Sequence, residues 1–241
     1  MKKIEPKDMD VIILCGGQGT RLRDVIDDRP KSMVEINGRP FLDILLDYVV
    51  RHGFSRFILC TGFKGDWIKK NYENKRGGLT LLISDEDQPL GTAGAIKNAE
   101  SLIESDLFLV LNGDSLCEID IEDFIDFHIR KGALISIAVT RMESRAEYGV
   151  IRLDKNQKVI RFGEKIPARG NGLINAGIYV FAKKILEEIP AGQRLSLEYD
   201  LFPAILHKSL YAYVTERRLL DIGTPERLEL ARKYFGSREM G

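Results

Sequence analysis

Apolar residues in the first half of the chain gather in short runs that alternate with segments of helical spacing. The short runs predict buried strands, because they are rich in β-branched residues and too short for typical helices. Between them, apolar side chains recur at helical spacing, as at Leu42, Leu45 and Val49. The pattern predicts strands at Val11–Leu14, Arg56–Cys60, Leu79–Ser84 and Leu107–Leu111, and helices at Phe41–His52, around Lys64–Tyr72 and at Thr92–Ile103.

The second half continues this alternation and adds a hairpin. Turn-forming residues at Asp154–Gln157 separate two apolar runs within Val150–Phe162, which is typical of two antiparallel strands. Further strands are predicted at Ile135–Thr140, Leu173–Phe181 and Leu210–Thr215, and helices at Ile121–Lys131, Ser196–Leu206 and Pro225–Phe235. No linker, repeat or low-complexity tract interrupts the pattern. We therefore expect one α/β domain over residues 1–241, with a Rossmann-like mixed, mostly parallel central sheet flanked by helices.

A glycine cluster follows the first predicted strand. Gly16, Gly17 and Gly19 come directly after it, and Arg21 follows. Glycine allows a turn whose backbone approaches a ligand closely, and the N–H groups of such a turn can bind phosphate. The spacing fits neither the dinucleotide-binding G-x-G-x-x-G nor the P-loop G-x-x-x-x-G-K-[ST]. Because glycine-rich turns follow strands in many α/β proteins, the cluster alone is a weak signal for a phosphate site of another kind.

Charge and cysteine content narrow the function classes. Lys plus Arg and Asp plus Glu number 36 each, so the formal net charge is zero and gives no field that favours nucleic acid or an anionic membrane. Cys15, Cys60 and Cys117 lie far apart, so neither a zinc site nor a disulfide framework is indicated. Cys15 and Cys60 each end an apolar run, which favours small buried side chains over nucleophiles. There is no apolar signal region and no run of about 18 apolar residues. We expect a cytoplasmic protein with no nucleic-acid or membrane partner, and a homo-oligomer is compatible with the sequence.

Six motifs, in a fixed order, resemble those of the sugar-1-phosphate nucleotidylyltransferases. The family pattern GGxGTRL…PKPM…xGKP is matched by Gly16–Leu22, Arg29–Met33 and Asn37–Pro40. The other matches are Pro89–Ala95, Leu111–Asp114, Glu164–Lys165, Asn175–Tyr179 and Asp221–Glu226. Ser32 and Ile166 stand where the family usually has proline, which affects loop shape and leaves the charged groups in place. The resemblance extends from about residue 10 to about residue 230.

The family transfers a nucleotidyl group from a nucleoside triphosphate to a sugar 1-phosphate and releases pyrophosphate. A phosphate oxygen of the sugar attacks the α-phosphorus in line, so the protein supplies positioning and charge neutralisation, with no covalent nucleophile. The resemblance implies a glycosyltransferase-A-like nucleotidyltransferase fold, with residues of about 10–115 binding the nucleotide and about 116–235 the sugar phosphate. It also implies Mg²⁺ as a cofactor held by carboxylates.

The resemblance assigns Asp114 and Asp221 to the metal, and Arg21 and Lys31 to the triphosphate. From the residues alone, Asp114 is better explained as a turn aspartate that caps the next element. Asp221 could cap the closing helix, but Thr224 already fits that position. Most lysines and arginines are solvated surface charges, and this remains the alternative for Arg21 and Lys31. We expect Arg21, Lys31 and Asp114 to be the catalytic residues.

Further binding residues follow from the same resemblance. Glu86 is placed to accept hydrogen bonds from a base edge, and guanine offers a carboxylate two adjacent N–H donors. Lys165 would hold the sugar phosphate, while Glu164 and Asn175 would bind sugar hydroxyl groups. The expected nucleotide-binding set is Leu14, Gly16, Gly17, Gly19, Thr20, Arg21, Lys31, Glu86, Gly91, Thr92, Asn112 and Asp114, and the expected sugar-phosphate-binding set is Gly149, Glu164, Lys165 and Asn175.

Within the family, three segments resemble most the D-glycero-α-D-manno-heptose 1-phosphate guanylyltransferases: Thr20–Arg23, Gly172–Tyr179 and Ser196–Asp200. This predicts GTP and that heptose 1-phosphate as substrates, in the synthesis of a surface polysaccharide or glycan. The alternatives are a mannose 1-phosphate guanylyltransferase and a thymidylyl- or cytidylyltransferase for another sugar. Retention of the charged residues disfavours a nucleotide-sugar-binding subunit without turnover, and the missing G-x-G-x-x-G disfavours a Rossmann oxidoreductase.

Overall fold

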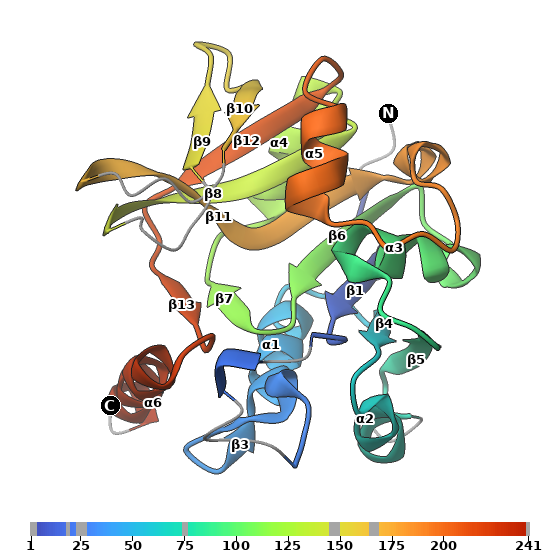
Figure 1. The fold of residues 1–241 in the computed structure, drawn as a ribbon, viewed down its shortest axis with the longest axis vertical. Helices are drawn as coiled ribbons and strands as arrows, with labels where there is room; N and C mark the ends of the chain where they lie inside the picture. Colours follow the sequence, from blue (N-terminus) through green and yellow to red (C-terminus); the bar gives the residue numbers. More distant parts are fainter. Residues whose placement is uncertain are drawn as a thin grey trace.

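The computed structural model describes residues 4–17, 20–22, 28–73, 77–144, 150–163 and 169–239. These residues form a nine-stranded mixed sheet with helices on both faces (Figure 1). Its strand order is β10-β9-β11-β6-β1-β4-β5, with β8 beside β11 and β12 beside β8. The parallel part of the sheet contains β1 (Asp10–Leu14), β4 (Arg56–Thr61), β5 (Thr80–Asp85) and β6 (Leu107–Asn112). The expected α/β class with a flanked central sheet is confirmed.

The second half of the chain extends the same sheet, mostly with antiparallel strands. Its strands are β8 (Ile135–Ser144), β9 (Val150–Leu153), β10 (Val159–Phe162), β11 (Arg169–Ala182) and β12 (Leu210–Thr215). The long strand β11 pairs antiparallel with β8 on one side and with β6 and β9 on the other. It therefore joins strands from both halves of the chain into one sheet.

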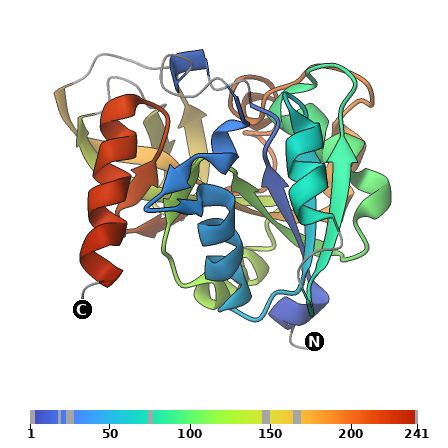
Figure 2. The ribbon, with the colours of Figure 1, turned by 90° about the horizontal axis from the view of Figure 1, so that it is seen from below.

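Neighbouring residues of the central strands point to opposite faces of the sheet, as the strand period requires. In β1, Val11 and Ile13 belong to one hydrophobic core and Ile12 to the other. The first core is covered by α1 (Phe41–Val50), α2 (Gly65–Tyr72), α4 (Ile121–Lys131) and α6 (Pro225–Glu239), of which α1, α2 and α6 are seen next to each other in Figure 2. The second is covered by α3 (Gly91–Asn98), a 3₁₀ turn at Lys183–Glu188 and the segment around α5 (Phe202–Ala204). Burial on both faces explains why these strands read as continuous apolar runs.

Two short antiparallel pairs were not predicted. They are β2 (Glu35–Ile36) with β3 (Arg39–Pro40), and β7 (Ser115–Cys117) with β13 (Leu219–Asp221). Strands of two or three residues are too short for a periodic signal. The β7–β13 pair places Asp221 opposite Ser115, the residue that follows Asp114. A segment near the end of the chain thereby lies beside the carboxyl end of β6 (Figure 1).

Two predicted helices are wrong in their extent. The helix expected at Thr92–Ile103 ends at Asn98, and a tighter 3₁₀ turn follows at Glu100–Leu102. The helix expected at Ser196–Leu206 is a π-helical turn at Leu197–Leu201 that leads into the short α5. Pro203 accounts for this break, because proline has no N–H and its ring clashes with the carbonyl group four residues earlier.

In the part of the chain that the structure describes, none of the helices combines the length and apolar character needed to cross a bilayer.

Candidate active site

A cleft of about 360 Å³ opens at the carboxyl ends of β1, β4, β5 and β6. Ligands of open parallel sheets bind at this edge. Most of the expected nucleotide-binding residues line the cleft, namely Leu14, Gly16, Gly17, Glu86, Gly91, Thr92, Asn112 and Asp114. The remaining lining residues are Cys60, Thr61, Pro89, Ala95 and Arg194. The residues that the resemblance assigned to the nucleotide are thus brought together from several strand ends.

Glu86 is held in the cleft by a backbone group and by two glycines. Its Oε2 accepts a hydrogen bond from the Leu90 N–H, with a donor–acceptor distance of 3.1 Å. Its Oε1 lies so close to two glycines that a Cβ atom on Gly62 would be 2.5 Å from it and one on Gly16 would be 3.1 Å away. Burial raises the pKa of the Glu86 carboxyl, and the Leu90 N–H opposes this shift. A side chain at Gly16 or Gly62, which follow the neighbouring strands β1 and β4, would therefore displace this carboxylate.

Asn112 brings a buried acceptor to the same cleft. Its Oδ1 is buried and has no hydrogen-bond partner among the residues that the structure describes. An unpaired buried polar group costs about 1–3 kcal/mol. A ligand N–H or O–H that donates to Asn112 would remove this cost, which supports the expected role of Asn112 in nucleotide binding.

Lys31, Asp114 and Asp221 share one small space at the end of β6. Lys31 Nζ lies 2.5 Å from Asp114 Oδ2, and the Ile222 N–H donates to the Asp114 carbonyl oxygen at 3.0 Å. A Cβ atom on Gly223 would lie 2.6 Å from Asp221 Oδ1 and 3.3 Å from Lys31 Nζ. The side chain of Lys31 is only 15% exposed. Its ammonium group is therefore largely shielded from solvent and held next to Asp114.

Asp221 is itself oriented by the first turn of α6. Its Oδ2 lies 2.9 Å from Arg227 Nη1, and its Oδ1 accepts a hydrogen bond from the Gly223 N–H. Thr224 Oγ1 lies 3.4 Å from the backbone nitrogen of Arg227, which is the capping position expected for this threonine. Gly223 and Arg227 thus fix the position of the Asp221 carboxylate at the start of α6.

The donor set of this corner suits Mg²⁺. Among the described residues, no group of three or more His, Cys, Asp or Glu side chains is arranged to hold a metal ion. Mg²⁺ does not need such a group, because one or two protein carboxylates usually hold it together with substrate phosphate oxygens and water. The carboxylates of Asp114 and Asp221 are oxygen donors of the type that Mg²⁺ prefers. Their contacts with Lys31 and Arg227 show that both carboxylates already compensate positive charge.

On the other side of β6, polar residues of β11 face the helical turn that precedes α5. Asn175 Nδ2 donates to the Tyr179 hydroxyl group at 2.7 Å, and Asn175 Oδ1 accepts from the Gly177 N–H at 3.0 Å. Glu198 Oε1 lies 3.4 Å from Asn175 Nδ2, and Glu198 Oε2 lies 3.5 Å from Thr92 Oγ1. The expected sugar-side residue Asn175 and the expected nucleotide-side residue Thr92 are therefore linked by one carboxylate.

This geometry agrees with a match to a known family model described as nucleotidyl transferase, which covers residues 10–236. The chain belongs to the nucleotidyl transferase family. It is 34% identical over 226 residues to the D-glycero-alpha-D-manno-heptose 1-phosphate guanylyltransferase of Aneurinibacillus thermoaerophilus, which covers 93% of this chain and 97% of the relative. It is also 34% identical over 222 residues to a mannose-1-phosphate guanylyltransferase of Mycobacterium tuberculosis, covering 90% of this chain and 62% of that protein.

The crystal structure of HddC from Yersinia pseudotuberculosis, complexed with GMP-PN, is similar in fold, with a TM-score of 0.83 and 37% sequence identity. The likeness covers 94% of this chain and 99% of that chain. The expected family and the expected enzyme class, a nucleotidyltransferase, are confirmed.

Several expected site residues of this nucleotidyl transferase lie elsewhere or outside the described residues. Gly19, Gly149, Glu164 and Lys165 lie outside them, and only the backbone of Thr20 is described. Arg21 is exposed in a 3₁₀ turn at Thr20–Leu22. Arg21, Lys31 and Asn175 are not among the described residues that line the cleft.

Sequence reasoning missed three residues at the site of this nucleotidyl transferase. Thr61 ends β4, and its Oγ1 donates to Asp85 Oδ1 at 2.8 Å, so the rule about strand ends could have found it. Arg194 lines the cleft from a loop with no periodic pattern. Glu198 was noticed only as part of a family motif, because a lone glutamate in an amphipathic segment is usually a surface charge.

The three cysteines of the nucleotidyl transferase are buried. Burial raises the pKa of the Cys15 and Cys117 thiols to about 12, and it raises the pKa of Cys60 as well. Neutral thiols are poor nucleophiles. The interpretation of Cys15 and Cys60 as small buried side chains is confirmed, and Cys117 is buried as well.

Proposed function

We propose that this nucleotidyl transferase transfers a guanylyl group from GTP to D-glycero-α-D-manno-heptose 1-phosphate and releases pyrophosphate. The observation that carries the choice of base is Glu86, a half-buried carboxylate that lines the cleft and whose Oε1 occupies space left free by Gly16 and Gly62. Guanine offers two adjacent N–H donors to a carboxylate, whereas thymine and uracil offer a single ring N–H. The heptose guanylyltransferase relative, which matches over almost its whole length, supports the choice of sugar.

In the proposed reaction, a phosphate oxygen of the sugar 1-phosphate attacks the α-phosphorus of GTP, and the bond to pyrophosphate breaks. Lys31 neutralises charge that develops on the phosphates, because its ammonium group is fixed next to Asp114 before substrate arrives. Arg21 is proposed to bind the triphosphate tail. Asp114 and Asp221 would hold Mg²⁺, which when bound supplies positive charge to phosphate oxygens.

The sugar phosphate is proposed to bind on the other side of β6, near Asn175, together with Gly149, Glu164 and Lys165. In this arrangement residues of about 10–115 bind the nucleotide and residues of about 116–235 bind the sugar phosphate, within one domain. We propose a cytoplasmic location, where GTP and sugar phosphates are available.

A mannose 1-phosphate guanylyltransferase is the second candidate. The observation that favours it is the 34% identity to the mycobacterial enzyme of that name. The heptose shares the ring configuration of mannose and differs by one carbon beyond the ring. The two candidates therefore make the same demands on the nucleotide side of the site.

The test is pyrophosphate release measured with GTP, ATP, CTP and dTTP, each combined with a panel of sugar 1-phosphates in the presence of Mg²⁺. The highest kcat/KM is expected with GTP and the manno-configured heptose 1-phosphate. A higher value with mannose 1-phosphate would favour the second candidate. Equal or faster turnover with dTTP or CTP would contradict the assignment of Glu86 to guanine, and nucleotide binding without any pyrophosphate release would contradict catalysis.

A further inference from the structure

Residues 193–198 form a strap that lies against the nucleotide side of the cleft. The Leu195 carbonyl oxygen accepts the Ala93 N–H at 2.9 Å, and the Leu195 N–H donates to the Leu90 carbonyl oxygen at 2.8 Å. The Leu197 N–H donates to Thr92 Oγ1 at 2.7 Å. These bonds fix the strap to the first turn of α3, so the side chain at its end, Glu198, has a defined position.

The carboxylate of Glu198 has acceptor capacity that its present contacts do not use. Its Oε1 lies 3.4 Å from Asn175 Nδ2 and 3.5 Å from the Tyr179 hydroxyl oxygen. Its Oε2 lies 3.0 Å from Ser196 Oγ and 3.5 Å from Thr92 Oγ1. Protein hydrogen bonds usually measure about 2.7–3.0 Å, so the Ser196 contact alone is of ordinary length. Oε1, the oxygen nearer to β11, is the less satisfied of the two.

The charge of Glu198 indicates what kind of group completes this environment. Glu198 takes part in no ion pair with the described lysines and arginines. A half-buried carboxylate needs hydrogen-bond donors, since burial without them is costly. It also repels phosphate oxygens. The partner that suits Oε1 is therefore a neutral donor, and the hydroxyl groups of a sugar ring are such donors.

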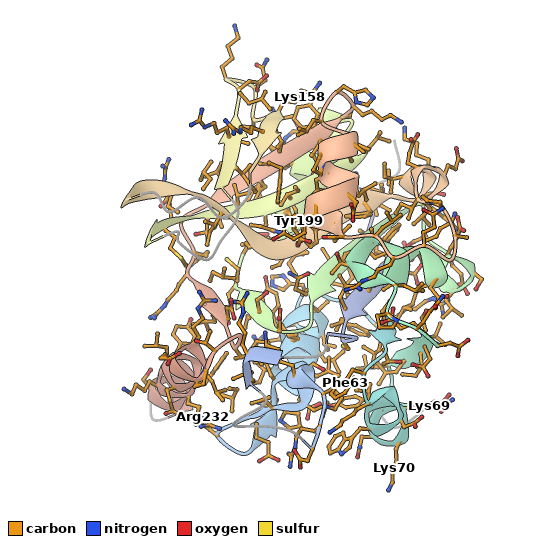
Figure 3. All side chains as sticks on the ribbon, viewed as in Figure 1. Phe63, Lys69, Lys70, Lys158, Tyr199 and Arg232 are labelled. Atoms are coloured by element: carbon orange, nitrogen blue, oxygen red, sulfur yellow. The ribbon has the colours of Figure 1, made fainter. Side chains whose placement is uncertain are left out.

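The residue that follows the strap is exposed to solvent. Tyr199, the next residue, is 61% exposed, and Figure 3 shows it beside α5. The half-buried carboxylate of Glu198 contacts Asn175 of β11 and Thr92 of α3. The π-helical turn thus carries both an exposed aromatic side chain and a carboxylate that lies between β11 and α3.

We propose that Glu198 determines sugar specificity: its Oε1 accepts a hydrogen bond from a ring hydroxyl group of the sugar 1-phosphate. Its Oε2, through Thr92 and the strap, holds this oxygen at a fixed place relative to the bound nucleotide. The proposal deepens the proposed transfer to a sugar 1-phosphate and rests on it. An analogue without that hydroxyl group leaves the carboxylate buried and unpaired, which is how a site rejects a smaller substrate.

The experiment pairs Glu198→Gln with deoxy sugars. Pyrophosphate release is measured with the sugar 1-phosphate that reacts fastest and with its monodeoxy analogues. For wild-type protein, removal of one particular hydroxyl group is expected to lower kcat/KM by about 10- to 100-fold, the range for a hydrogen bond to a charged group. For E198Q, kcat/KM with the parent sugar should be lower than the wild-type value by a similar factor. With that one analogue, E198Q should have the same kcat/KM as with the parent sugar. GTP affinity without sugar phosphate should change by less than about twofold, since the strap's backbone bonds remain.

Asp200→Asn is the matched control, because it removes a carboxylate from the same turn. Asp200 Oδ2 accepts the Ser196 N–H at 2.7 Å. This variant is expected to lower kcat/KM by one common factor for all the sugars. Glu198→Asp, which keeps the charge and withdraws the oxygen, is a second variant that should reproduce the pattern of E198Q if the glutamine protein folds poorly.

The proposal is overturned if E198Q and E198D lower kcat/KM by the same factor for the parent sugar and every deoxy analogue, or if they weaken GTP binding as much as turnover. Wild-type protein that releases no pyrophosphate with any sugar 1-phosphate overturns the proposed function itself, and this proposal with it.

Discussion

The two sides of the site hold their carboxylates by different means. On the nucleotide side, Glu86 accepts a backbone N–H and lies in a space left by Gly16 and Gly62. On the sugar side, Glu198 is surrounded by hydroxyl and amide side chains, mostly at 3.4–3.5 Å. Backbone groups cannot change rotamer, whereas side-chain donors can. If the proposed roles hold, the base is recognised by a carboxylate in a preformed frame, and the sugar by a carboxylate whose neighbouring side chains can change rotamer.

The same contrast exists in the strands below. The nucleotide cleft lies at the ends of the parallel strands β6, β1 and β4, whose register is fixed along their lengths. The sugar side depends on β11, whose pairing with β8 shifts register between Asn175 and Tyr179. A register shift of this kind redirects side chains locally. Small sequence changes can therefore alter the sugar pocket while the nucleotide cleft stays in place.

The largest effect is expected where both sides depend on one group. Asp114→Asn should lower kcat by about 100- to 1000-fold with every sugar, because a preorganised charge at the phosphates is lost. Pyrophosphate release across a Mg²⁺ titration measures this. Asp126→Asn, an exposed carboxylate of α4, is the control that should keep its activity. Retention of more than about a tenth of the rate in D114N would exclude the proposed metal role.

The next largest effect should fall on the nucleotide side alone. In Gly62→Ala, the new Cβ atom would lie 2.5 Å from Glu86 Oε1 and must displace it. The preference for GTP over ATP should fall by about 10- to 100-fold, while the ranking of sugars stays unchanged. Competition between the two nucleotides at limiting enzyme measures the ratio. Gly77→Ala is the matched control, because a Cβ atom there meets nothing within 4 Å.

If G62A changed the ranking of sugars as strongly as that of bases, the two sides would not be separable, and the comparison drawn above would fail.

A smaller effect concerns pH and the same carboxylate. Burial raises the pKa of Glu86, and only the ionised form accepts both N–H groups of guanine. GTP should therefore bind with full affinity above this raised pKa. Its affinity should fall as the pH decreases through the pKa, by at most about tenfold per pH unit. Calorimetric titration from pH 8 to pH 5 measures this, and Glu86→Gln should bind weakly with a flatter profile. The difference between the two profiles removes the contribution of the triphosphate's own titration, and parallel profiles would contradict the role of Glu86.

The smallest effect on activity is expected from His128, a buried residue of α4 that contacts β8. Burial lowers the pKa of His128 to about 4, from 6.5, and its Nδ1 lies 3.0 Å from Ser136 Oγ. A lowered histidine pKa means that the unfolded chain binds the extra proton, so stability is full above pH 6.5 and is lost as pH falls from 6.5 to 4. The loss amounts to about 3 kcal/mol.

Urea unfolding of wild-type protein and His128→Gln at several pH values measures this loss. The wild-type free energy of unfolding should fall more steeply below pH 6.5 than that of the variant. At pH 7.5, the two proteins should rank the sugar 1-phosphates in the same order of turnover. Equal slopes would show that His128 is not held neutral in the fold.

Much of the nucleotide side could be predicted from the sequence, and less of the sugar side. Strand ends in a parallel sheet meet at one edge, so the position of Glu86 and Asp114 followed from the order of strands. The contact of Glu198 with Asn175 joins two segments through tertiary packing, which no local pattern encodes. The π-helical turn was not predicted, because apolar spacing alone does not reveal how Pro203 disrupts the hydrogen bonds of the helix. Strands as short as β7 and β13 were not predicted, because three residues are too few to show an alternation of apolar and polar positions.

The pairing of β13 with β7 sets the order in which a newly made chain becomes competent. Synthesis proceeds from the amino end, so the strands around the GTP cleft emerge from the ribosome well before Asp221. An unfinished chain that stops before β13 has Asp114 but lacks its proposed metal partner. Under the proposed mechanism, turnover therefore requires that the late-made segment has joined the early one.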